Sequence, residues 1–161
     1  QNVQLQFLFQ QHLYEPAAGP RLRGVCPDLL TINAGGDDIF DPETRPSWAT
    51  TLDEHAAQLR ELLEGLQSAC PSTRLYWRTT TPICGPNFGL STHDGNQMIR
   101  RSNLRVTEAL RGLVFARVFD SWQRTVGHCD QYDDGLHHAA LVEEHVRALL
   151  EDYCSAVGLP L

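Results

Sequence analysis

From residue 27 to the C-terminus, short apolar runs alternate with longer amphipathic stretches. Short runs rich in β-branched and aromatic side chains predict strands, whereas apolar residues at three- and four-residue spacing predict helices. The expected strands lie between Pro27 and Gly35, at 73–81 and at 113–119, and the expected helices lie at 52–68, 96–110 and 138–153. This order predicts an α/β fold, a three-layer αβα sandwich with a mostly parallel sheet.

A further strand is expected near the N-terminus, over residues 3–9, where apolar and polar side chains alternate. Segments rich in Pro, Gly and polar residues are predicted to be loops: 11–24, 41–50, 83–95 and 121–133. Thr51 and Glu54 match a capping box, in which each side chain binds the other residue's backbone N–H. The helix that follows is therefore expected to begin near residue 52.

Length and composition limit both the architecture and the partners. The 161 residues are enough for one domain, residues 1–161, and no stretch has the roughly 18–20 apolar residues that a membrane span needs. A net charge of −7 disfavours binding to nucleic acid. All 13 basic residues are Arg, which excludes chemistry that uses a Lys of this chain.

Five cysteines occur at positions 26, 70, 84, 129 and 154, and none has the spacing of a metal site. Disulfides in a secretory compartment or outside the cell are the better interpretation. An odd number leaves one Cys free or paired outside the chain. The sequence also begins with Gln1 and has its only Met at position 98, so we expect an N-terminally incomplete or processed chain.

The apolar run after Pro27 ends in Gly35, Gly36, Asp37 and Asp38. Open α/β sheets place their chemistry at the carboxyl ends of strands, so these four residues are a candidate site. A plain turn capped by Asp side chains explains the same pattern equally well.

A second candidate is the segment Asp134-Gly135-Leu136-His137-His138, directly before the last predicted helix. A carboxylate three residues before a His, with Gly between them to allow a tight turn, can orient the imidazole as in a catalytic triad. An ordinary turn before a helix is the alternative that these residues leave open.

Taken together and in this order, these segments resemble the SGNH (GDSL-type) hydrolase superfamily, in its PC-esterase-like branch of glycan O-acetyltransferases and acetylesterases. The similar stretches are INAGGDDIFD (32–41), WRTTTP (77–82), VFD (118–120) and DGLHH (134–138). The resemblance implies that His137 is the general base and Asp134 its orienting partner. It also implies that Gly35 to Asp38 is the oxyanion block, with Asp37 where the family has an Asn. An ionised Asp accepts hydrogen bonds only, so Asp37 departs from the pattern.

The family's nucleophile, a Ser in a Gly-Asp-Ser block, has no counterpart in this sequence. One expectation is an acyl-ester hydrolase or O-acyltransferase, acting on O-acetyl groups of glycans or on another small ester, with its Ser upstream of Gln1. The alternatives are a catalytically inactive SGNH-like domain with a structural or interaction role in a protein assembly, and an unrelated α/β binding domain. A Ser mechanism needs no cofactor or metal, so none is expected.

Overall fold

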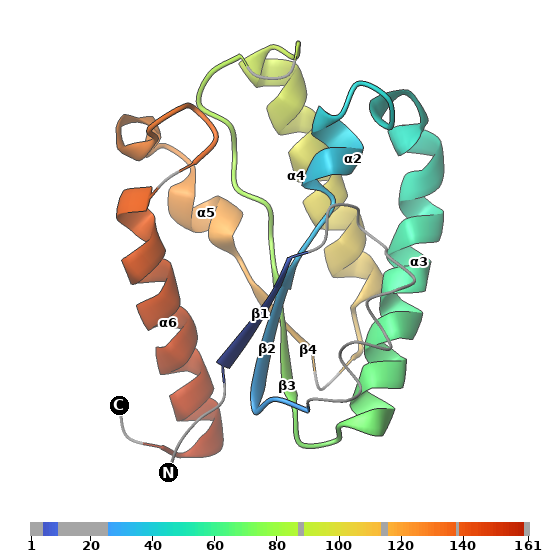
Figure 1. Cartoon of the computed structure of the whole chain (residues 1–161), viewed down its shortest axis with the longest axis vertical. Helices are drawn as coiled ribbons and strands as arrows, with labels where there is room; N and C mark the ends of the chain where they lie inside the picture. Colours follow the sequence, from blue (N-terminus) through green and yellow to red (C-terminus); the bar gives the residue numbers. More distant parts are fainter. Residues whose placement is uncertain (1–4, 10–25, 87–88, 114–115, 138, 160–161) are drawn as a thin grey trace.

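The structure, a computed structural model, describes residues 5–9, 26–86, 89–113, 116–137 and 139–159. Within these residues the fold is α/β, and the strands form one parallel sheet in the order β1-β2-β3-β4 (Figure 1). The strands are β1 (Leu5–Phe9), β2 (Leu29–Asn33), β3 (Arg74–Arg78) and β4 (Ala116–Phe119). Leu29 is paired with Leu5 and Arg74, and Leu75 with Ala116. A mostly parallel sheet is thereby confirmed.

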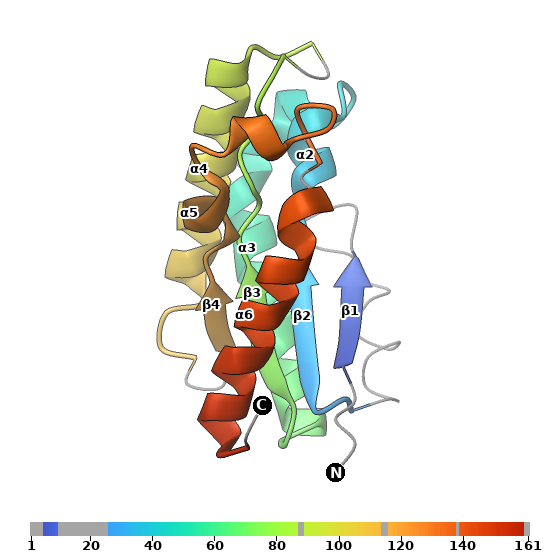
Figure 2. The same ribbon diagram turned by 90° about the vertical axis from the view of Figure 1, so that its left-hand side faces the viewer.

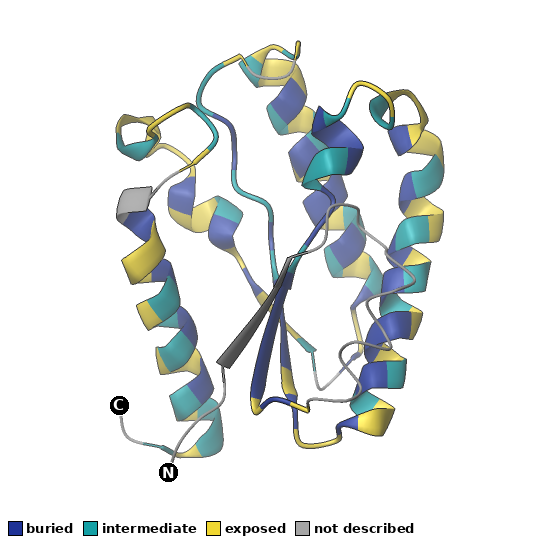
Figure 3. Ribbon diagram, viewed as in Figure 1, coloured by how far each residue is buried: buried dark blue, intermediate teal, exposed yellow. Residues whose placement is uncertain are grey.

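Successive side chains of the central strands point to opposite faces of the sheet and contribute to two separate hydrophobic clusters. On one face, Leu30 and Trp77 pack with α3 (Arg45–Ala69) and α4 (Thr92–Ala109). On the other face, Leu29 and Tyr76 pack with α6 (Ala139–Val157). Figure 2 shows α6 in front of the sheet and α3 and α4 behind it. The buried residues gather on the helix sides that face the strands (Figure 3).

The helix after β2 begins earlier than expected, because the segment 41–50 is not a loop. A short helix α2 (Gly36–Phe40) follows β2 directly, and α3 already begins at Arg45. Pro46 lies in the first turn of α3, where its missing N–H needs no partner. The predicted capping box is wrong: Thr51 lies inside α3, and its hydroxyl contacts the carbonyl oxygens of Ser47 and Trp48.

Two other predicted loops also contain helix. α4 begins at Thr92, four residues before the expected start, because Ser91 caps it by accepting a hydrogen bond from the N–H of Asp94 at 3.1 Å. The segment 121–133 contains α5 (Ser121–Thr125) and the 3₁₀ helix η1 (Cys129–Gln131). α5 and η1 are too short to show a helical period in the sequence. The predicted loop at 11–24 lies outside the described residues.

Two disulfides link described residues, Cys26 with Cys70 and Cys84 with Cys129. Cys154 of α6 is the remaining free thiol. The sequence expectation of disulfides with one odd cysteine is confirmed.

No helix in the described part of the chain has the length and apolar character to cross a membrane.

Candidate functional site

Asp134 and His137 form a hydrogen-bonded pair just before α6. Oδ2 of Asp134 lies 2.7 Å from Nδ1 of His137, while Oδ1 accepts the backbone N–H groups of Leu136 at 2.9 Å and His137 at 2.7 Å. Gly135 between them has φ 79°, a left-handed conformation that a side chain would strain. The tight turn expected from the Asp-Gly dipeptide therefore brings the carboxylate onto the imidazole.

These hydrogen bonds favour the ionised form of Asp134. The backbone N–H of His137, followed by the imidazole and the N–H of Leu136, lowers the pKa of Asp134 far below its usual range. An ionised Asp134 only accepts, so Nδ1 of His137 is the donor in this contact, and in the neutral imidazole Nε2 then holds the lone pair. The side chains of His137 and Asp134 are 72% and 55% exposed, so the pair lies at the surface of the described part of the chain.

The segment that carries this pair is fastened to the loop after β3. The N–H of Cys84 donates to the carbonyl oxygen of Gly135 at 2.7 Å, and Cys84 is bonded to Cys129 of η1. Leu136 packs against the larger hydrophobic cluster. These contacts hold the turn before α6 at the carboxyl end of the sheet, the upper end in Figure 1.

The other predicted block, Gly35 to Asp38, lies at the same end of the sheet (Figures 1 and 2). Gly35 has φ 90° and turns the chain from β2 into α2, which contains Gly36, Asp37 and Asp38. Asp38 is buried, with Oδ1 4.0 Å from Nδ1 of His55 on α3. The block is therefore a strand-to-helix turn, and its Asp38 side chain lies toward α3.

Two polar residues at the carboxyl ends of β2 and β3 were not predicted as site residues. A guanidinium nitrogen of Arg78 donates to Oδ1 of Asn33 at 3.1 Å, and Nδ2 of Asn33 donates to the carbonyl oxygen of Arg78 at 2.9 Å. Both side chains are partly buried. The only sequence signal was their place at the ends of two apolar runs, which does not reveal that they face each other.

The chain after β3 is held by two Asn side chains of α4. Asn103 accepts the N–H of Thr80 and donates to its carbonyl oxygen, both at 2.8 Å. Asn96 does the same with Ile83, at 2.8 and 2.9 Å. The backbone between Arg78 and Cys84 is thus fixed before it meets Gly135.

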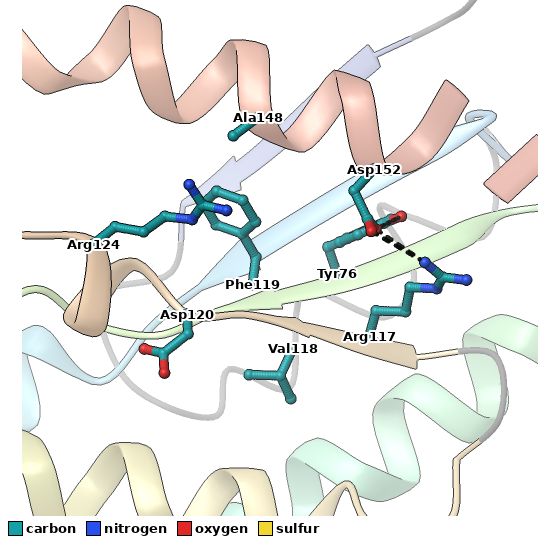
Figure 4. Close-up of a pocket in the computed structure, with 8 residues that line it drawn as sticks. All are labelled: Tyr76, Arg117, Val118, Phe119, Asp120, Arg124, Ala148 and Asp152. Carbon is teal, nitrogen blue, oxygen red and sulfur yellow. Dashed lines mark hydrogen bonds and ion pairs between the residues drawn. The ribbon is translucent and has the colours of Figure 1, made fainter. Parts of the chain in front are cut away.

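A groove of about 500 Å³ lies beside β4, apart from the Asp134–His137 pair (Figure 4). At one end, Asp152 accepts hydrogen bonds from Tyr76 at 2.6 Å and Arg117 at 3.1 Å. At the other end, the guanidinium of Arg124 lies 4.9 Å from the ring centre of Phe119. Figure 4 shows Ala148 and Asp152 of α6 on one side of this groove.

Within the described residues, no three His, Cys, Asp or Glu side chains are grouped in a way that would hold a metal ion. No protein-family model matches the chain, and no curated protein sequence matches it.

Proposed function

We propose that this chain is part of an acyl-ester hydrolase or O-acyltransferase in which His137 is the general base and Asp134 orients it. The observation that carries the proposal is the 2.7 Å contact between Asp134 Oδ2 and His137 Nδ1, on an imidazole side chain that is largely exposed. This arrangement prepares the imidazole to take a proton from a hydroxyl group.

In the proposed reaction, His137 Nε2 takes the proton of a Ser hydroxyl as the Ser oxygen attacks the acyl carbonyl carbon. The ester C–O bond then breaks, and the leaving alcohol takes the proton from His137. Water, or a sugar hydroxyl in a transferase, next attacks the acyl-enzyme with His137 again as the base. The Ser would come from outside residues 1–161, because no Ser of the described residues is hydrogen-bonded to His137.

The resemblance to SGNH hydrolases supplies the finer part of the proposal. Helices on both faces of the sheet support a three-layer αβα sandwich, and O-acetyl groups on glycans are the proposed substrate. The two disulfides support a location in the secretory lumen or outside the cell. Gly35 and Gly36 would contribute backbone at the oxyanion, while an ionised Asp37 would have to turn away from it.

Activity is tested by ester cleavage and by labelling with a fluorophosphonate probe, using the whole gene product. We expect His137→Ala to lower kcat by about 10²- to 10⁴-fold, the usual contribution of a general base. The exposed His93 of α4 gives the control, and His93→Ala should leave turnover unchanged. Unchanged cleavage by His137→Ala would exclude the proposed role.

The second candidate is a catalytically inactive SGNH-like domain that serves as an interaction subunit. The observation that favours it is Asp37, which stands where a hydrogen-bond donor to the oxyanion is required. This candidate predicts that no Ser of the full-length product reacts with the fluorophosphonate. Covalent capture of a Ser would exclude it.

A further inference from the structure

Arg78 is the last residue of the central strand β3 and so lies at the carboxyl end of the sheet, where open α/β sheets bind their ligands. Neighbouring strands are in register up to Ile32 and Trp77, so Asn33 and Arg78 follow side by side. Asn33 Oδ1 accepts from one terminal nitrogen of Arg78 at 3.1 Å. Asn33 in turn is fixed by Nδ2, which donates to the carbonyl oxygen of Arg78 and to Thr80 Oγ1.

Among the described residues, no carboxylate lies within 4 Å of the Arg78 side chain, and its one hydrogen-bond partner is the neutral amide of Asn33. The contrast is with Arg105 and Arg117, which form ion pairs with Asp53 and Asp152. Those carboxylates raise the pKa of their arginines, whereas burial lowers the pKa of Arg78. A partly buried guanidinium without a counter-ion is unfavourable unless an anion completes it.

The surroundings indicate which kind of anion would bind. The guanidinium offers a planar pair of N–H groups beyond the one that Asn33 occupies, which suits a carboxylate. Asp37 of α2 follows the carboxyl end of β2, and the turn with Asp134 is bonded through Gly135 to Cys84 after β3. The whole chain also has a net charge of −7, so a singly charged group is favoured over a doubly charged phosphate.

We propose that Arg78, oriented by Asn33, binds a carboxylate of the ligand at the carboxyl end of the sheet. This inference rests on the proposed function for its substrate class: the acyl ester would be carried by an acidic sugar, such as a uronate. Arg78 would then hold the sugar while His137 acts at the ester.

Binding is measured first, with a probe that contains no ester, so that the result does not depend on catalysis. Galacturonate is titrated into the full-length protein by calorimetry, with galactose as the neutral counterpart. We expect galacturonate to bind more tightly, and Arg78→Gln to weaken its binding by about 10- to 100-fold, as for a lost charge-assisted hydrogen bond. Arg100→Gln, which removes an exposed Arg of α4, is the charge-matched control and should have no effect.

Equal binding of galacturonate and galactose, or equal binding by the wild type and Arg78→Gln, would overturn the proposal. If Arg78→Gln does not fold, the wild type supplies the test, because the Arg78 Nε–H resonance should shift with galacturonate and not with galactose. Absence of that shift would likewise overturn it.

Turnover distinguishes this inference from the proposed function. With O-acetylated galacturonate and O-acetylated galactose as substrates, Arg78→Gln should reduce kcat/KM for the acidic ester selectively, by a factor similar to that for binding. His137→Ala should lower kcat for both esters by about 10²- to 10⁴-fold and leave galacturonate binding intact. Binding without turnover in the wild type would reject the enzymatic proposal alone, and turnover without selectivity would reject the role of Arg78 alone.

Discussion

The backbone N–H of Cys84 donates a hydrogen bond to the carbonyl oxygen of Gly135 at 2.7 Å. Gly135 lies between the two members of the Asp134–His137 pair, and Cys84 is also joined to Cys129 by a disulfide. Cys84 thus holds the segment with the pair in two ways. Its backbone N–H binds Gly135 directly, and its disulfide fixes Cys129 of η1, which precedes Asp134 in the chain. This arrangement predicts that the disulfide affects the pair as well as overall stability.

Replacing Cys84 and Cys129 with Ser should lower the free energy of unfolding by about 2–4 kcal/mol, because the unfolded chain regains the entropy of a closed loop. It should also loosen the Asp134–His137 turn. We expect faster amide exchange at His137, whose N–H donates to Asp134 at 2.7 Å. Denaturant unfolding and hydrogen exchange measure the two effects.

The disulfide between Cys26 and Cys70 provides a matched control. Its sequence separation is 44, against 45 for Cys84 and Cys129, so the loss of stability on replacing both Cys with Ser should be similar. Cys26 and Cys70 precede β2 and β3 and lie at the opposite end of the sheet from Asp134. Equal acceleration of exchange at His137 in both double variants would contradict a specific role for Cys84 and Cys129.

The pKa of Asp134 should distinguish the contribution of its side-chain partner, the His137 imidazole, from the contributions of its backbone partners. In His137→Ala the imidazole is lost, but the N–H groups of residue 137 and Leu136 still donate to Oδ1. The pKa of Asp134 should therefore rise and yet remain below its usual range, because the backbone donor of residue 137 is the largest cause of the depression. NMR of the carboxyl carbon measures this pKa, and His128→Ala should leave it unchanged.

The lowered pKa of Asp134 also predicts the direction in which the stability of the protein changes with pH. A carboxyl whose pKa is lower in the folded state contributes stability above the unfolded pKa of about 3.9, and this contribution is lost as the pH falls further. Asp134→Asn should therefore flatten the acid side of the stability profile below about pH 4. If the stability of Asp134→Asn changed with pH below about pH 4 as steeply as that of the wild type, the lowered pKa of Asp134 would be contradicted.

The sequence predicted the parallel sheet and the long helices because apolar periodicity reports which side of each element is buried. The same periodicity did not predict the short helices. α2 and α5 contain five residues each, which is too few for a period, and the start of α4 is set by the Ser91 cap. Residues 45–50 were misread because Pro46 suggests a loop, although it is compatible with the first turn of a helix.

The geometry of the candidate site was predictable where its residues are close in sequence. Asp134 and His137 meet within one turn, so their spacing alone indicated the contact. Asn33 and Arg78 are 45 residues apart, and their contact depends on the register between β2 and β3. Asp38 remains a candidate site residue, and its position beside His55 of α3 depends on helix α2, which the sequence pattern did not predict. Register and helix starts are the information that the sequence pattern lacks.

Tyr76 should affect how the stability of the protein changes at alkaline pH. Burial, and then the hydrogen bond to Asp152, raises the pKa of Tyr76. A raised folded pKa gives stability that is complete below the unfolded pKa of about 10 and is lost as the pH rises above it. Tyr76→Phe should cost about 0.5–1.5 kcal/mol at pH 8 through the lost 2.6 Å hydrogen bond, and its deficit should narrow above pH 10.

Tyr153 is the control for this prediction. Its pKa is also raised by burial, but its hydroxyl has no hydrogen-bond partner among the described residues. In Tyr153→Phe the free energy of unfolding should therefore fall less steeply above pH 10 than in the wild type. At pH 8 this variant should not lose the stability that Tyr76→Phe loses with its hydrogen bond. Chemical denaturation at a series of pH values measures both variants, and a Tyr76→Phe deficit that grows above pH 10 would contradict the sign.

Gly95 and Ile83 should be energetically coupled. Gly95 is buried in the first turn of α4, and a Cβ added there would lie 2.5 Å from Cδ1 of Ile83. Gly95→Ala should therefore destabilise the protein by about 1–3 kcal/mol through overpacking, although Ala is the better helix former. Ile83→Val removes that Cδ1 atom, so the double variant should be more stable than the sum of the single effects predicts. Denaturant unfolding of the four proteins measures the coupling, and simple additivity would show that α4 moves away from Ile83 instead.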